Sequence, residues 1–365
     1  MSLNIAIAKI GANITFSSRN GSAASADIIY ALRTLKGFKH KFTIVTQKTS
    51  NTVIPNSIKL QEIGITANFN DFDLVLLFNG TINFFGGVAN EQLFSLYRAL
   101  SKTNKPIIYV QTDGAMYLQN LWNSIKGRDW ANNLTPEEFE INADNVYYLT
   151  QGRIIQRTRN AIEHKKGIRI VPKGIFHFPW EQTILSEYER YLPYKHTKRI
   201  YDLGFGGYIR NAYKQRRIEK YYDEPDLSTL LFGNLRGIKL RNTKVKPKVP
   251  YQEMINTMAQ CKATVIVGDE EYNNHFHTLR MYECLLAGNL VFIDKVLDDR
   301  ATFYAGIPNS SWFLVESTED VRNKLWTVDE EFIKETQTKV IEDRLQRSLS
   351  KILNNKLEDI LCDHQ

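Results

Sequence analysis

The feature that most constrains the fold of this sequence is an alternation of short apolar, β-branched runs with helical patterns, which starts twice along the chain. In the first half the runs occupy residues 5–10, 42–47, 74–78, 107–111, 146–150 and 168–171. In the second half they occupy residues 200–205, 230–232, 264–267, 290–293 and 312–315. This alternation is typical of parallel sheets with crossover helices. The sequence therefore predicts an α/β fold with two Rossmann-like, doubly wound units.

The two units also give the expected domain boundaries, and a length of 365 residues favours about two domains. We expect residues 1–178 to form an N-terminal domain and residues 179–339 a C-terminal domain, with a linker beginning near residue 174. Apolar residues at helical spacing predict a helical tail over residues 330–360, among them Ile341, Leu345, Leu349 and Leu353. We expect residues 340–365 to pack back on the first domain.

The composition is that of an ordinary soluble globular protein, with 43% hydrophobic and 24% charged residues. No apolar run approaches the roughly 20 residues that cross a bilayer, and the N-terminus lacks the basic region of a signal peptide. We therefore expect a cytoplasmic protein. Cys261, Cys284 and Cys362 have neither disulfide nor zinc spacing, so we interpret them as buried or incidental thiols.

The charge distribution is compatible with a polyanionic binding partner but does not require one. The formal charge is +7, and two basic runs stand out, one around Arg153 and one with Arg236, Lys239, Arg241, Lys244, Lys246 and Lys248. Such runs are usually solvated surface. One in each half would also suit the walls of a cleft that holds nucleic acid.

The segment most informative about function follows the apolar run 263–267, where a loop opens into a helix. It places Arg280 and Glu283 three residues apart, a spacing that puts both on one helix face. Such a helix starts at the carboxyl end of a strand, where α/β proteins bind ligands. A carboxylate can accept both hydroxyls of a ribose, and a guanidinium can bind a diphosphate with two hydrogen bonds. The pair indicates one end of a nucleoside diphosphate site, although an ordinary surface ion pair has the same spacing.

A second candidate segment follows the first strand of the second unit. Gly206 and Gly207 free backbone amides, a helix begins after them, and Arg210, Arg216 and Arg217 follow. Together these groups suit an anion cradle for phosphates. The alternative is that the arginines only solvate an exposed helix, but the agreement with the first segment favours phosphate binding.

Neither unit contains a GxGxxG turn or a GxxxxGK[ST] loop, so tight dinucleotide or P-loop binding is not supported. Two facing Rossmann-like domains with a cleft between them are also the layout of one large class of glycosyltransferases. In a protein with that layout, the groups that activate the acceptor are expected in the first unit.

A carboxylate and an aromatic loop are the candidates there. Asp113 follows the strand 107–111, at the carboxyl edge of the sheet. If a diphosphate sugar lies on the second domain, a carboxylate across the cleft is where an acceptor hydroxyl must lose its proton, so Asp113 is the candidate base. An isolated Asp at such a turn is more often a helix N-cap than a base, and this alternative is stronger for Asp27 than for Asp113. Phe84 and Phe85, between glycines, suit either core packing or the probing of nucleic-acid bases.

These segments resemble the phage T4-type DNA β-glucosyltransferases, which glucosylate 5-hydroxymethylcytosine, and the similarity spans nearly the entire chain. Its most specific pieces, in chain order, are the loop 82–87, Thr112-Asp113, Gln151-Gly152, the turn from Gly206 to Arg210 with Arg216, Phe232-Gly233-Asn234, and Gly268-Asp269 through Tyr272 to Arg280 and Glu283. Ordered matches of this kind are hard to obtain by chance, so the chain is identified as a member of this family.

The resemblance implies a GT-B fold, in which two Rossmann-like domains face each other across a cleft, and an inverting transfer from a UDP-sugar to a base flipped out of duplex DNA. It implies a general base at Asp113 and an acid beside the sugar at Asp27. The residues that it places at the donor are Gly207 and Tyr208 at the glycine turn, Arg210, Arg216 and Arg280 at the diphosphate, Glu283 at the ribose, Tyr272 and Phe232 as nucleotide-contacting aromatics, and Lys248 and Val249 at uracil.

Three departures from the family pattern lie near the expected sugar and phosphates. Asp27 stands where the family has the longer Glu, Tyr208 stands where a small Ser follows the double glycine, and the segment from Arg210 to Arg216 is two residues longer. Tyr208 could fill the space of a hexose hydroxymethyl group. UDP-glucose is therefore the expected donor, with a pentose donor such as UDP-arabinose as the alternative.

We expect a single displacement, in which Asp113 takes the proton of the hydroxymethyl oxygen as that oxygen attacks the anomeric carbon. Mg²⁺ or Mn²⁺ could assist the departure of UDP, with Asp269 as a candidate ligand, although no dedicated carboxylate cage is visible. Extrusion of the base is expected to use Asn83, Phe84 and the basic stretches, including Arg153.

Two other function classes stay open: a GT-B transferase with a non-DNA acceptor, and a catalytically silent DNA-binding protein. A DNA-binding assay separates the first from the expected function, and a UDP-sugar hydrolysis test separates the second. The expected partners are a UDP-sugar and hydroxymethylated duplex DNA. The expected setting is a monomer in the cytoplasm of an infected bacterium, where the modification would protect phage DNA from nucleases.

Overall fold

The computed structural model describes residues 2–10, 40–46, 58–62, 68–79, 99–111, 145–150, 174–177, 198–235, 237–273, 278–346 and 357–363. The chain divides into two compact units, one of residues 1–17, 21–180 and 350–365 and the other of residues 18–20 and 181–349. The domain boundary expected after residue 178 stays a prediction, because residues 178–197 lie outside the described ranges.

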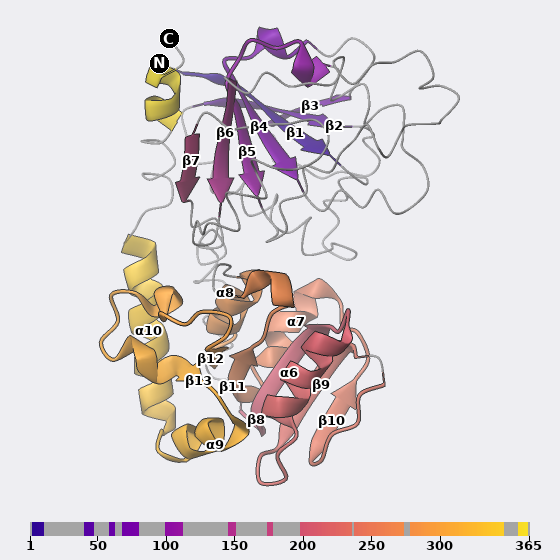
Figure 1. Ribbon diagram of the computed structural model, residues 1–365, viewed down its shortest axis with the longest axis vertical. Coiled ribbons are helices and arrows are strands. Elements are labelled where there is room, and N and C mark those ends of the chain that lie inside the picture. The colour runs from indigo at the N-terminus through magenta and orange to yellow at the C-terminus, as the bar shows by residue number, and fades with distance from the viewer. Residues whose placement is uncertain are drawn as a thin grey trace. The chain divides into compact units, whose positions relative to one another are not determined.

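The described part of the first unit is a seven-stranded parallel sheet in the order β3-β2-β1-β4-β5-β6-β7 (Figure 1). Its strands are β1 (Asn4–Ile10), β2 (Lys41–Thr46), β3 (Ile58–Glu62), β4 (Leu74–Asn79), β5 (Ile107–Gln111), β6 (Val146–Thr150) and β7 (Gly174–His177). Consecutive residues of β1, from Ile5 to Ala8, are fully buried, so both faces of this strand are covered. Burial on both faces explains why the central strands are continuous apolar runs in the sequence.

The described part of the second unit contains a six-stranded parallel sheet in the order β10-β9-β8-β11-β12-β13 (Figure 1). Its strands are β8 (Tyr201–Tyr208), β9 (Thr229–Asn234), β10 (Thr243–Lys246), β11 (Cys261–Ile266), β12 (Leu290–Asp294) and β13 (Leu314–Val315). Its helices are α6 (Ala212–Tyr222), α7 (Tyr251–Met258), α8 (Leu279–Leu286), α9 (Thr318–Trp326) and α10 (Glu330–Gln346). Two doubly wound units are thus confirmed.

The strands that the sequence did not predict, β3, β7 and β10, all lie at sheet edges. An edge strand needs no run of residues buried on both faces, so its sequence carries little apolar signal. β7 forms inside the segment interpreted as a linker, which corrects that interpretation, and the expected strand 168–171 lies outside the described residues. β10 carries Lys244 and Lys246, and charged side chains on an edge strand discourage pairing with other chains. Part of the second basic run therefore has a structural explanation.

The C-terminal part of the chain is divided between the two units. Helix α10 lies in the second unit, whereas residues 350–365 lie in the first. There Leu357 and Ile360 are buried. The pKa of His40, next to β2, is lowered by burial and partly restored by the Glu358 carboxylate. The expected packing of residues 340–365 on the first domain stays a prediction.

Two further expectations concern the thiols and the membrane. Cys261 and Cys284 are buried and Cys362 is exposed, and burial raises the pKa of the Cys284 thiol to about 12. A thiol with such a pKa is unreactive at neutral pH. Within the described ranges, no helix has the length and apolar character required to cross a membrane.

Candidate diphosphate-binding site

The second sheet has its topological switch point between β8 and β11. From β8 the chain proceeds outward to β9 and β10, and it then returns to β11 on the other side of β8. In open α/β sheets the helices that follow the two strands on either side of such a point diverge, and ligands usually bind there, outside the carboxyl ends of the strands. Both segments singled out in the sequence start at this edge, one after β8 and one after β11.

Glycines let the carboxyl ends of β8 and β9 approach closely. A Cβ at Gly206 would lie 2.2 Å from Cζ of Phe232, and a Cβ at Gly233 would lie 2.0 Å from the Gly207 carbonyl oxygen. Gly233 also has a φ of +120°, which side chains rarely allow. Phe232 is 2% exposed, with its ring against Gly206, so it packs under the glycine turn. Its expected contact with the nucleotide stays a prediction.

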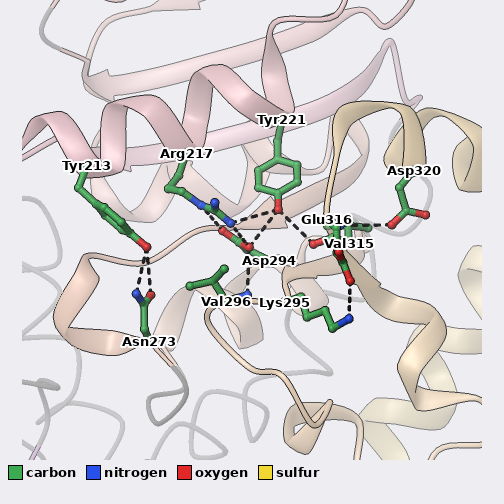
Figure 2. A network of polar contacts seen from close by, with 10 residues as sticks. All are labelled: Tyr213, Arg217, Tyr221, Asn273, Asp294, Lys295, Val296, Val315, Glu316 and Asp320. Carbon is green, nitrogen blue, oxygen red and sulfur yellow. Dashed lines mark hydrogen bonds and ion pairs between the residues drawn. The ribbon is translucent and has the colours of Figure 1, made fainter.

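The start of α6 is fixed to the loop after β11 by Asp269. Asn211 is the N-cap of α6, and its side chain accepts a hydrogen bond from the Lys214 backbone N–H at 2.9 Å. The same side chain donates from Nδ2 to Asp269 Oδ1 at 3.3 Å. Lys214 Nζ lies 3.7 Å from Asp269 Oδ2. A second tie joins the same elements, because Asn273 Nδ2 donates to the Tyr213 hydroxyl at 3.0 Å (Figure 2).

Lys214, which contacts this carboxylate, is also subject to the charges of two arginines. The pKa of Lys214 is lowered, first by burial and then by the charges of Arg210 and Arg280, while Asp269 opposes the shift. The charges of Arg210, which precedes α6, and Arg280, in the first turn of α8, thus both act on Lys214. The roles of Arg210, Arg216 and Arg280 as diphosphate ligands stay predictions.

Arg280 and Glu283 lie on one face of α8, as their spacing predicted, and their role toward a nucleotide stays a prediction. Arg280 Nη1 lies 3.1 Å from Glu283 Oε2, with the arginine side chain 28% exposed and the glutamate 3% exposed. The guanidinium also contacts the Met254 sulfur of α7. Tyr272 is buried in the loop before α8. A nearly buried carboxylate with a more accessible guanidinium is not the ordinary surface ion pair that the sequence left open.

The remaining arginines of α6 differ in their surroundings. Arg217 forms a two-point ion pair with Asp294 at the end of β12, in which Nε donates to Oδ2 at 2.6 Å and Nη2 to Oδ1 (Figure 2). The hydroxyl of Tyr221 completes the network, 3.0 Å from Asp294 Oδ1 and 3.1 Å from the Val315 carbonyl oxygen. Arg217 thus stabilises the fold of this unit rather than joining the anion cradle. Arg216 is exposed on the helix surface.

Other expected donor residues lie at the rim of the unit. Tyr208, the last residue of β8, is 45% exposed. Lys248 is exposed and Val249 partly exposed, just after β10. Their roles toward uracil and sugar stay predictions.

The residues expected to serve the acceptor lie outside the described ranges, namely Asp27, Asn83, Phe84, Asp113 and Arg153. The strands that precede two of them are in place. β4 ends at Asn79, before the aromatic loop, and β5 ends at Gln111, two positions before Asp113.

A divalent ion was a further component that the sequence left open. In the parts of the chain that the structure describes, no group of three or more His, Cys, Asp or Glu residues could hold a metal. Asp269, the candidate ligand, is engaged by Lys214 and Asn211. The carboxylate oxygens of Asp269 therefore already interact with the Lys214 ammonium group and the Asn211 amide.

Sequence reasoning missed Lys214 and Asn211. The available signal was local: an Asn directly before a helix is a common N-cap, and the residue three positions later lies in the first turn. Nothing local, however, shows that this turn faces Asp269, which lies 55 positions further along the chain.

Comparisons with known proteins agree with this geometry. Residues 3–183 match the family model described as bacteriophage T4 beta-glucosyltransferase. A relative, the DNA beta-glucosyltransferase of Enterobacteria phage T4, is 26% identical over 360 residues, which cover 93% of this chain and 97% of the relative.

Solved structures of the T4 phage enzyme are also similar. The complex with UDP and Mn²⁺ has a TM-score of 0.75 and 22% identity, and the match covers 98% of this chain and 99% of that one. The complex with UDP-glucose has a TM-score of 0.75 and 20% identity, with the same coverage. The likeness shows that this chain has the GT-B fold.

Proposed function

Because the chain belongs to the bacteriophage T4 beta-glucosyltransferase family, we propose that it transfers a sugar from a UDP-sugar to DNA. In its finer form, the proposal is an inverting transfer to the hydroxymethyl group of 5-hydroxymethylcytosine in phage duplex DNA. The product would protect the phage genome from nucleases in the cytoplasm of the infected host, and the enzyme would act as a monomer.

The observation that carries the proposal is the charge arrangement at the switch point of the second sheet. Glu283 is nearly buried and Arg280 is more accessible, so the carboxylate suits a ribose and the guanidinium suits a phosphate. Arg210 lies close enough to affect the same lysine as Arg280. These groups fit a nucleoside diphosphate, in agreement with the UDP bound to the T4 relative.

The proposed chemistry divides between the units. Asp113, two positions past the end of β5, would take the proton from the hydroxymethyl oxygen as it attacks the anomeric carbon. The bond between that carbon and the diphosphate oxygen breaks, and UDP leaves on the opposite face. Arg210 and Arg280 would hold the charge that develops on the leaving diphosphate, a contribution of about 3 to 4 kcal/mol for a well-placed donor. A divalent ion, when bound, would share that charge.

The acceptor half of the proposal rests on the family and on charge. A base inside a duplex must be extruded before its substituent can react, which costs a few kcal/mol. Asn83, Phe84 and Arg153 are the residues proposed to support extrusion. The excess of positive charge, +7 overall, favours binding of the phosphate backbone.

UDP-glucose is the first donor to test, because a solved T4 structure holds it. A pentose donor such as UDP-arabinose is the second candidate, and Tyr208 is the observation that favours it. This bulky side chain ends β8 beside the glycine turn and is 45% exposed, so it is free to occupy space near a bound sugar.

The test is an incubation of hydroxymethylated duplex DNA with UDP-glucose, UDP-arabinose and related donors, followed by mass spectrometry of the nucleosides. Unmodified cytosine DNA is the control. We expect a hexosyl or pentosyl increment on hydroxymethylcytosine alone. If no donor modifies this DNA although the protein binds UDP, the DNA acceptor is wrong and a non-DNA acceptor replaces it.

A further inference from the structure

We propose that the β10 edge of the second unit binds the phosphate backbone of duplex DNA close to the reacting base. This β10 surface consists of Lys244 and Lys246 on the strand, Lys248 just after it, and Lys239 and Arg241 in the loop before it. The inference rests on the DNA-modifying function proposed above. It adds a DNA contact on the unit to which the donor is assigned.

The β10 surface carries positive charge that no acid of the same segment balances. From residue 227 to residue 252 the sequence contains six Lys and Arg and neither Asp nor Glu. Lys239, Lys244 and Lys248 are exposed, and in the described part of the chain none of the three forms an ion pair. Unbalanced charge of this kind attracts polyanions.

An acid does pair with cations elsewhere in the unit and with one member of the surface. Lys262 Nζ lies 2.8 Å from Asp202 Oδ1. On the β10 surface, Arg241 Nε lies 3.2 Å from Asp223 Oδ1, with the arginine side chain 62% exposed. An exposed pair contributes little to stability, so a phosphate can take the place of the carboxylate at Arg241.

Protection of an edge strand explains only part of this charge. That protection requires charged side chains on the strand itself, as at Lys244 and Lys246. Lys246 also donates from Nζ to Gln260 Oε1 at 3.4 Å. Lys239 and Lys248 lie outside the strand, in the segments before and after it. An anionic partner accounts for the exposed charges on both sides of the strand.

The register of the sheet places the β10 surface beside the candidate diphosphate site. Lys246 is opposite Phe232 on β9, and Phe232 is opposite Gly206 on β8, so β10 ends level with the glycine turn. Adjacent strands are about 4.8 Å apart, and β10 therefore lies about 10 Å from β8, or about three base-pair steps of 3.4 Å. A duplex whose reacting base enters the site has phosphates within reach of these lysines.

The donors of this surface suit phosphates. β10 is the last strand of the sheet in the described ranges, and half of the N–H groups of such a strand point away from the sheet, toward any partner. Lys244 and Lys248 are separated by at most about 14 Å of chain, the axial length of about four base pairs. Lysines and backbone N–H groups contact phosphates without reading bases, so binding should be independent of sequence.

The test compares Lys239→Gln/Lys244→Gln with the matched control Lys334→Gln/Lys339→Gln. The control removes two exposed lysines from α10, on the other side of the second sheet (Figure 1). Affinity for hydroxymethylated duplex DNA, and for the same duplex with unmodified cytosine, is measured by fluorescence anisotropy over a range of salt concentrations. Affinity for UDP is measured by calorimetry on the same preparations.

The β10 variant should bind both duplexes about 10- to 60-fold more weakly at about 0.1 M salt, because each phosphate contact contributes about 0.9 to the salt exponent. The slope of log affinity against log salt should become shallower by about 1 to 2. In the sugar-transfer assay the KM for DNA should rise by a similar factor, while kcat and UDP affinity stay nearly constant. The control should differ from the wild type by less than about twofold, and Lys239→Arg/Lys244→Arg should keep the affinity.

Each other outcome overturns the inference in a recognisable way. If the β10 variant keeps the wild-type affinity and salt slope, this edge does not contact DNA. If the control loses as much affinity, the effect is one of total charge. If only the hydroxymethylated duplex is affected, the residues act at the acceptor base, and if UDP affinity falls equally, their role is structural.

Failure of the proposed function has a different signature. If the wild type binds neither duplex even at low salt, the DNA acceptor and the inference fail together. If the wild type transfers sugar to DNA and the β10 variant does so with an unchanged KM, only the inference fails. Thermal unfolding establishes that each variant is folded, and the two single Gln variants replace the double variant if it is not.

Discussion

Replacement of Asp294 by alanine should destabilise the second unit strongly. The Asp294 side chain is 4% exposed and the partner Arg217 side chain 17% exposed. The carboxylate also accepts from the Val296 N–H at 3.2 Å, and it lies 3.0 Å from the Tyr221 hydroxyl (Figure 2). Its removal leaves the guanidinium without its acid in a largely buried position, while Tyr221 keeps the Val315 carbonyl.

The expected size follows from these contacts. Breaking a buried ion pair on one side costs about 3 to 5 kcal/mol, and the partial exposure of Arg217 favours the lower end, about 3 kcal/mol. For a unit of this size, each kcal/mol lowers the melting temperature by about 2 to 4 °C, so a decrease of about 6 to 12 °C is expected.

Differential scanning calorimetry measures this decrease. Lys295→Ala is the matched control, because it removes an exposed ion pair with Glu316 next to the same strand and should hardly change the transition. A change of less than about 2 °C for Asp294→Ala would refute the structural role that we assign to the network.

Two further predictions concern the candidate site and the strands that support it. Glu283→Gln should weaken UDP binding by about 10-fold or more, as measured by calorimetry. The same variant should show a smaller preference for UDP over its 2′-deoxy analogue. If that preference is unchanged, Glu283 does not bind the ribose. Gly233→Ala should lower the melting temperature by several degrees, because φ is +120° and the new Cβ would meet the Gly207 carbonyl oxygen; wild-type stability would contradict the close approach of β8 and β9.

The central strands could be predicted from the sequence because burial on both faces leaves continuous apolar runs, as in β1 and β12. The edge strands β3, β7 and β10 could not, because an edge strand has no such requirement. The GT-B fold and the family followed from ordered motifs and were confirmed.

In the candidate site, contacts within one helix could be predicted from the sequence, whereas contacts between distant segments could not. The Arg280 and Glu283 pair was predictable, because both residues lie on one helix and spacing determines their contact. The contact of Lys214 with Asp269 was not, because it joins segments that the fold alone brings together. Likewise, sequence could not separate Arg217 from Arg216, because the difference depends on which side of α6 faces Asp294.

The central claim is that one unit holds UDP while Asp113 of the other activates the acceptor, and Asp113→Ala tests it most directly. Sugar transfer to hydroxymethylated DNA and UDP affinity are measured on the same preparation of this variant and of the wild type. The account predicts that transfer is abolished and that UDP affinity is almost unchanged. Substantial transfer by Asp113→Ala would contradict it.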